Sequence, residues 1–66
     1  MSNKMTPGKI LKVYRDNAGL TLEQLAKMTG IAKSNLSQIE NDKRNVGLKT
    51  AKRLAEALKC NYKRFL

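Results

Sequence analysis

The sequence predicts an all-α fold, a compact domain of five short helices. Apolar residues recur three and four positions apart along most of the chain, as they do on the buried face of an amphipathic helix. No segment alternates as a half-buried strand does, and glycines separate the periodic segments. We expect residues 1–5 to be a flexible N-terminal arm and residues 6–66 to form a single domain. A chain of this length buries roughly 60% of its unfolded surface, so the core should be thin.

The first helix is expected to begin at Thr6-Pro7, because a capping hydroxyl is followed there by proline at the first helical position. Gly19 should end it, since glycine readily adopts the left-handed conformation that follows a helix. Four apolar or small residues share one face of this helix: Ile10, Leu11, Tyr14 and Ala18.

Residues 21–40 are expected to form a helix-turn-helix. Thr21 and Gln24 are three residues apart, which is the spacing of a capping box at the start of a helix. Gly30 ends that helix, and only a short turn remains before the next one. Two helices joined by so few residues, with glycine in the turn, form a helix-turn-helix unit. The inner stripe of the first of them consists of Leu22, Leu25 and Ala26.

The third helix, from about residue 32 to residue 41, has two faces of opposite character. With residues placed about 100° apart around the axis, Ala32, Leu36 and Ile39 fall together on a face suited to a core. Ala32 is also a poor N-cap, at a cost of about 1 kcal/mol relative to Ser or Thr. The opposite face carries hydrogen-bonding side chains and no acid: Lys33, Ser34, Ser37, Gln38 and Asn41.

Two further helices are expected after a basic loop at residues 43–47. Asn61 can cap the last of them, from Tyr62 to Leu66. Phe65 and Leu66 are too hydrophobic for an unattached tail, so they either complete the core or meet another subunit. The apolar face of the fourth helix is expected to consist of Leu48, Ala51, Leu54, Ala55 and Leu58.

The net charge favours a polyanionic partner. Fourteen Lys and Arg against five Asp and Glu give a formal charge of +9 and an isoelectric point near 10.1. A chain with this excess of positive charge could bind nucleic acid, an anionic membrane surface or an acidic protein. No apolar run approaches the ~20 residues of a membrane span, and the N-terminus does not resemble a secretion signal. We therefore expect a cytoplasmic protein that does not enter a membrane.

Enzymatic activity is not expected. The chain has no histidine and a single cysteine, Cys60, so it offers neither a zinc site nor a disulfide framework. We expect no cofactor and no metal. No nucleophile and base can be paired from the residues present.

The polar face of the third helix fits the major groove of DNA. That groove admits an α-helix and presents a distinct pattern of donors and acceptors for each base pair. Gln38 can pair with an adenine edge and Lys33 can donate to guanine, whereas Ser34, Asn35 and Ser37 could reach bases or phosphate. Such a face could also be merely solvated. The net charge and the helix-turn-helix favour binding to double-stranded DNA.

Residues 30–34 (GIAKS) and 36–40 (LSQIE) resemble the helix-turn-helix of the lambdoid repressor and Cro family, the xenobiotic-response-element type of regulator. Leu25-Ala26 and the later pair Ala55 and Leu58 also fall at the family's spacing. The resemblance covers nearly the whole chain and implies a five-helix repressor-like DNA-binding domain. It further implies a transcriptional regulator, most simply a repressor, that binds a palindromic operator as a homodimer through the major groove.

The resemblance also implies roles for particular residues. Arg15 and Glu40 would form a structural ion pair joining the first helix to the third. Asp42 stands where glycine is common and Val46 where proline is common, which affects the expected phosphate geometry of the loop. Base contacts are expected from Lys33, Ser34, Asn35, Ser37 and Gln38. Contacts with the DNA backbone are expected from Thr21, Gln24, Asn41, Lys43, Arg44 and Asn45.

The C-terminal helix is the expected dimer interface, through Tyr62, Phe65 and Leu66. Three other functions stay open at this stage. The chain could be an antitoxin-type DNA-binding protein that also neutralises a partner toxin, or a restriction-modification controller that activates as well as represses. A cationic membrane-surface peptide is disfavoured, because each helix carries a stripe suited to a core and Gly30 lies in a turn that packing requires.

Overall fold

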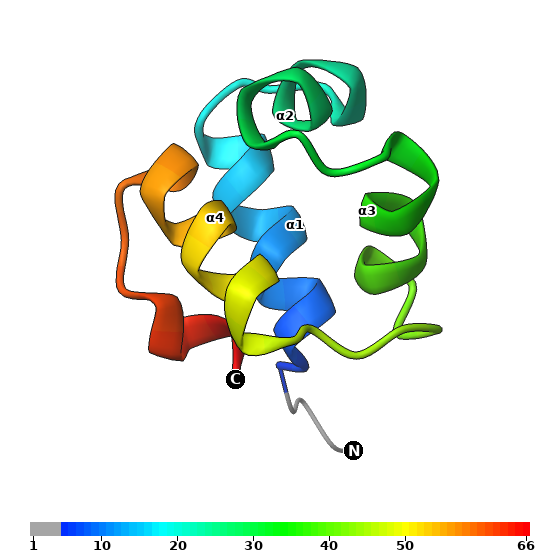
Figure 1. Cartoon of the computed structure of the whole chain (residues 1–66), viewed down its shortest axis with the longest axis vertical. Helices are drawn as coiled ribbons and strands as arrows, with labels where there is room; N and C mark the ends of the chain where they lie inside the picture. The colour runs from blue at the N-terminus through cyan, green and yellow to red at the C-terminus, as the bar shows by residue number, and fades with distance from the viewer. Residues whose placement is uncertain (1–4) are drawn as a thin grey trace.

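The computed structural model describes residues 5–66, which form four α-helices and one turn of 3-10 helix (Figure 1). The part of the predicted arm at residues 1–4 lies outside the described residues. Met5 is exposed and precedes the first helix. The helices are α1 Pro7–Asn17, α2 Leu22–Thr29, α3 Lys33–Glu40, α4 Leu48–Leu58 and the 3-10 helix η1 Tyr62–Phe65.

The C-terminal segment corrects the prediction of five helices. Its backbone bonds join residues three apart, with Arg64 N donating to Asn61 O at 3.0 Å and Leu66 N to Lys63 O at 3.3 Å. This is the 3-10 pattern, which is used in short pieces. The side chain of Asn61 accepts from Lys63 N at 3.0 Å, so the predicted cap of this turn is confirmed.

The predicted starts of α1 and α2 are confirmed by their capping bonds. Thr6 accepts from the backbone of Lys9 at 3.2 Å, with proline in the first turn. At α2, Gln24 N donates to Thr21 Oγ1 at 3.1 Å while Thr21 N donates to Gln24 Oε1 at 2.8 Å, a complete capping box. Gly30 follows α2 in the left-handed conformation, with φ of 73°.

The starts of α3 and α4 have no side-chain cap. Ala32 makes no side-chain bond at the start of α3, as predicted from its residue type. At the other end, the Asn41 amide donates to Ser37 O at 2.8 Å, and Asp42 then adopts a positive φ of 59°. Leu48 was predicted on the buried face of α4 but is 53% exposed, because it is the first residue of that helix and lies outside the core cluster.

All four α-helices and η1 contribute to one core. Phe65 is 1% exposed and packs edge-on against Tyr14, with ring centroids 5.9 Å apart. The prediction that Phe65 lies in a dimer interface is therefore wrong, since its side chain is enclosed within the monomer. Tyr62 and Leu66 keep exposed surface. The buried apolar residues are Leu11, Leu25, Leu36, Ile39, Ala51, Leu54, Ala55 and Phe65.

The arrangement leaves α3 at one side of the molecule, with η1 and the C-terminus at the other (Figure 1). Helix α3 packs on α1 and α2, while η1 packs on α4 and α1. The outer surface of α3 is thus free of the elements that close the core at the opposite side. Within residues 5–66, no helix is long and apolar enough to cross a membrane.

Candidate nucleic-acid interface

The turn between α2 and α3 is held by a threonine that the sequence analysis did not single out. Thr29 Oγ1 donates to Leu25 O at 2.8 Å and accepts from Ile31 N at 3.2 Å. Ile31 is half-buried against the core. The hydroxyl therefore joins the last turn of α2 to the first residue after Gly30. Threonine is common near helix ends as a local hydrogen-bonding residue, which is the only signal available in the sequence.

Helix α3 separates its apolar and polar residues as predicted, except that Ala32, expected on the core face, is exposed because it is the N-cap that precedes the helix. Leu36 and Ile39 are 0% and 3% exposed and hold the helix to the core. Lys33, Ser34 and Gln38 are exposed. The remaining two predicted base-contacting residues, Asn35 and Ser37, are half-buried.

The end of α3 is tied to α1 by Arg15 and Glu40, whose side chains are 12% and 7% exposed. Arg15 Nε donates to Glu40 Oε2 at 2.7 Å and Nη2 to Oε1 at 3.1 Å, a bidentate pair. Nη1 donates to Leu20 O at 2.7 Å, in the connection to α2. The hydrogen bond with Glu40 holds the pKa of Arg15 above its ordinary value. One guanidinium thus joins α1, the α1–α2 connection and α3.

A second contact between α1 and α3 lies beside Gly8, which is buried. A Cβ built on Gly8 would overlap the carbonyl oxygen of Ile39 and lie 2.8 Å from Asp42 Oδ1. Thr6 Oγ1 donates to that same Asp42 oxygen at 2.6 Å. The carboxylate of Asp42, which stands where glycine is common in the family, therefore accepts a hydrogen bond from the start of α1. No local pattern in the sequence indicates contacts between residues so far apart.

The start of α2 keeps donors for a phosphate. In the capping box, Thr21 Oγ1 and Gln24 Oε1 serve as acceptors, which leaves the threonine O–H and the glutamine amide N–H groups for other partners. Helix N-termini favour anions because of their orphan amides and dipole. Lys33 Nζ lies 3.2 Å from Glu23 Oε1, but both side chains are more than half exposed. Such a pair contributes little to stability and leaves Lys33 able to exchange partners.

The loop after α3 brings Arg44 back to the helix. Its Nη1 donates to Asn35 Oδ1 at 3.3 Å and to Gln38 Oε1 at 3.4 Å. Lys43 and Asn45, its neighbours in the loop, are exposed. Asn41 was expected to contact the DNA backbone, and its side-chain N–H donates to the backbone oxygen of Ser37 at 2.8 Å. Arg44, predicted to contact the DNA backbone, thus contacts Asn35 and Gln38, which are predicted to contact bases.

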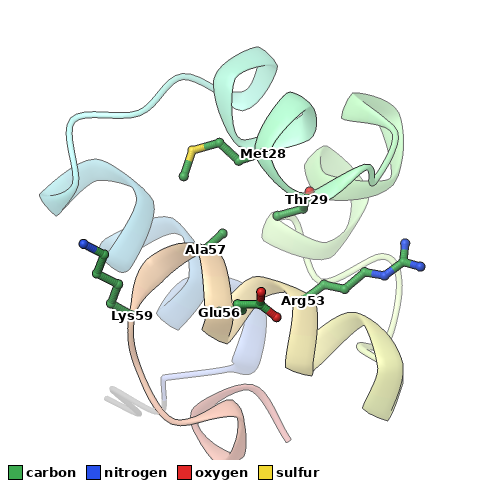
Figure 2. A pocket seen from close by; sticks show the side chains of 6 residues that line it. All are labelled: Met28, Thr29, Arg53, Glu56, Ala57 and Lys59. Carbon is green, nitrogen blue, oxygen red and sulfur yellow. The ribbon is translucent and has the colours of Figure 1, made fainter.

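A shallow hollow between α2 and α4 offers no comparable set of groups. It is lined by Met28 and Thr29 of α2, by α4 residues and by Lys59. Figure 2 shows Arg53 and Lys59 pointing away from each other across it. Because its polar groups do not converge, it lacks the arrangement expected of a small-molecule site.

The fold and the polar face of α3 together define a small helix-turn-helix domain of the DNA-binding class. Residues 11–65 match the HTH_3 helix-turn-helix family, and the chain belongs to this family, the lambda repressor and Cro type of transcriptional regulator. The family consists of DNA-binding regulators rather than enzymes.

Similar proteins include regulators of more than one kind. The chain is 45% identical over 56 residues to the HTH-type transcriptional repressor RghR of Bacillus subtilis, a match that covers 83% of this chain and 42% of RghR. It therefore spans less than half the length of that relative. The restriction-modification controller C.AhdI of Aeromonas hydrophila superposes with a TM-score of 0.86, 31% identity and 94% coverage of both chains. The biofilm regulator SinR, solved in complex with DNA, superposes with a TM-score of 0.83 and 32% identity. The match covers 89% of this chain and 98% of SinR.

Proposed function

We propose that this chain is a sequence-specific repressor of transcription that binds a palindromic operator as a homodimer. The observation that carries the proposal is the exposed row on α3, Lys33, Ser34 and Gln38, on a helix fixed by its buried face and by the Arg15–Glu40 pair. A rigidly held helix with short polar side chains can present donors and acceptors to base edges in the major groove. The similarity to the repressor RghR supports repression rather than activation of transcription.

The proposed contacts divide into two groups. Base edges are read from α3, by the exposed row together with the half-buried Asn35 and Ser37. Phosphates are bound at the start of α2 by Thr21 and Gln24 and after α3 by the polar residues Asn41, Lys43, Arg44 and Asn45. Contacts of the second kind fix the position of the protein on the duplex but carry no sequence information directly.

Dimerisation is proposed through the surface beside η1. Leu66 is 59% exposed and Tyr62 is half-buried, with Lys52 Nζ 5.5 Å from the centre of its ring. A two-fold dimer would place the two α3 helices in successive major grooves, about 34 Å apart. Selection of bound sequences from a random DNA pool tests both parts of the proposal. A two-fold motif supports specific dimeric binding, and an enriched motif without two-fold symmetry contradicts the dimer.

Replacing Gln38 with alanine is expected to reduce discrimination between the selected operator and scrambled DNA by about tenfold. A good base contact contributes about 1–3 kcal/mol of discrimination, and Gln38 lies on the exposed side of α3. Titrations of both DNAs by fluorescence anisotropy at one salt concentration measure the ratio. Lys43→Ala is the control, because loss of a phosphate contact weakens binding to both DNAs about equally. We call the side of α3 that carries Lys33, Ser34 and Gln38 the reading face. An unchanged ratio in Gln38→Ala would show that Gln38 does not read a base from this face.

A second candidate function is that of a restriction-modification controller, which could activate as well as repress. The similarity to the controller protein C.AhdI favours it, with 31% identity and a TM-score of 0.86. A reporter gene placed downstream of the selected operator distinguishes the two functions. Expression that only falls as the protein is supplied supports a repressor. Expression that first rises supports a controller-type activator.

A further inference from the structure

Arg44 makes contacts that a residue binding only phosphate would not need. Its Nη1 donates to two side-chain amides of α3, Asn35 Oδ1 at 3.3 Å and Gln38 Oε1 at 3.4 Å. These two residues are three apart, so they are neighbours on the helix surface. Asp42, the acid that precedes this loop, accepts a hydrogen bond from Thr6 Oγ1. The guanidinium therefore lies beside the reading face with amide oxygens as its acceptors.

These bonds orient the two amides relative to the guanidinium of Arg44. In a glutamine or asparagine side chain the oxygen and the NH₂ group are bonded to the same terminal carbon and point in diverging directions. With Oε1 directed to Arg44, Gln38 turns its Nε2 donor away from the guanidinium, and Asn35 does the same with Nδ2. Building on the proposed DNA-binding function, we propose that Arg44 is a positioning residue that determines base preference by holding these amides with their donors outward.

Amides with outward NH₂ donors would bind base edges that present hydrogen-bond acceptors. In the major groove guanine offers N7 and O6, adenine offers N7, and thymine offers O4, whereas cytosine offers only the N4 donor. An outward NH₂ group of Gln38 would meet an unfavourable donor on cytosine. Arg44 thus disfavours cytosine at the position that Gln38 reads. The two bonds use Nη1 alone, so Nε and Nη2 can still bind a phosphate.

Replacing Arg44 by alanine separates positioning from phosphate binding. The position read by Gln38 is first located as the one whose preference is lost in Gln38→Ala, using selection from a random pool. At that position the wild type is expected to bind a cytosine operator about tenfold more weakly than the best operator. In Arg44→Ala the amide of Gln38 can rotate and present its oxygen, so the cytosine penalty falls to within about twofold.

Lys43→Ala is the matched control, because it removes a neighbouring positive charge of the same loop from an exposed side chain. It should weaken all operators and keep the full cytosine penalty. A double-mutant cycle adds a readout that charge alone would not change. In the Gln38→Ala background, Arg44→Ala should leave the cytosine penalty unaltered, because the side chain through which it acts is already gone.

The outcomes separate this inference from the proposed function. If the wild type enriches no sequence at moderate salt, sequence-specific binding itself is contradicted. If the wild type enriches a motif and Arg44→Ala keeps the cytosine penalty while losing affinity, Arg44 binds phosphate only and the positioning role is overturned. Circular dichroism on each variant confirms that the comparison is between folded proteins. Arg44 is exposed, so its replacement should leave the melting temperature close to that of the wild type.

Discussion

Replacing Glu40 with glutamine is expected to lower the free energy of unfolding by about 3 kcal/mol. The carboxylate is 7% exposed and receives two hydrogen bonds from Arg15, which is itself 12% exposed. Glutamine has nearly the same shape, but it leaves the guanidinium in this enclosed setting without its opposite charge. In a domain of this size, each 1 kcal/mol corresponds to about 4–8 °C in melting temperature, so thermal unfolding measures the effect easily.

Asp16→Asn provides a matched control on the same guanidinium. Asp16 lies 3.3 Å from Arg15 Nη1, but its side chain is 57% exposed, whereas Glu40 is nearly enclosed. Solvent screens the exposed pair, so this variant should lose less than about 1 kcal/mol. Equal losses in the two variants would show that enclosure of the Arg15–Glu40 pair does not determine its contribution.

The Arg15–Glu40 pair also connects stability to DNA binding. Glu40 is the last residue of α3, and Arg15 holds it to α1 and, through Leu20 O, to the connection that precedes α2. Loss of the pair should loosen the end of α3 that carries Gln38. We therefore expect Glu40→Gln to weaken operator binding at a temperature where the variant is still folded.

Local signals in the sequence were sufficient for the four α-helices and for the starts of α1 and α2, but not for the 3-10 form of η1. Proline after Thr6 and the Thr21–Gln24 capping box act within one turn of chain, so a neighbouring residue determines each outcome. The spacing of Leu36 and Ile39 likewise determined which side of α3 is buried. The polar face opposite them follows from the helical repeat alone.

Contacts between distant residues could not be predicted in this way. The residue pattern marked Phe65 as hydrophobic, but whether it enters its own core or another subunit depends on where Tyr14 lies in three dimensions. The path of the loop after α3 determines that Arg44 returns to Gln38. The bond from Thr6 to Asp42 likewise depends on the start of α1 lying beside the residues that follow α3. Spacing along the chain does not carry this information.

Gly8 shows the same limit, and its replacement by alanine is expected to destabilise the fold by about 3 kcal/mol. Within a helix, exchange of glycine for alanine ordinarily adds up to about 1 kcal/mol of stability. Here a Cβ would overlap the carbonyl oxygen of Ile39, and it would also crowd Asp42 Oδ1 at 2.8 Å. Because the main obstacle is backbone of α3, no rotation of a side chain relieves it, and α1 and α3 must separate. Urea unfolding measures the loss.

Gly47→Ala is the control for this substitution. Gly47 precedes α4 with φ of −74°, and a Cβ there would meet nothing within 4 Å. Alanine is a poorer N-cap than glycine, so that variant should lose at most about 1 kcal/mol. Separation of α1 from α3 would displace the reading face, so Gly8→Ala should also bind the operator more weakly while still folded. A Gly8→Ala protein as stable as Gly47→Ala would contradict the close approach of α1 to Ile39. It would also contradict the packing of α3 against α1 that is proposed to hold the reading face in place.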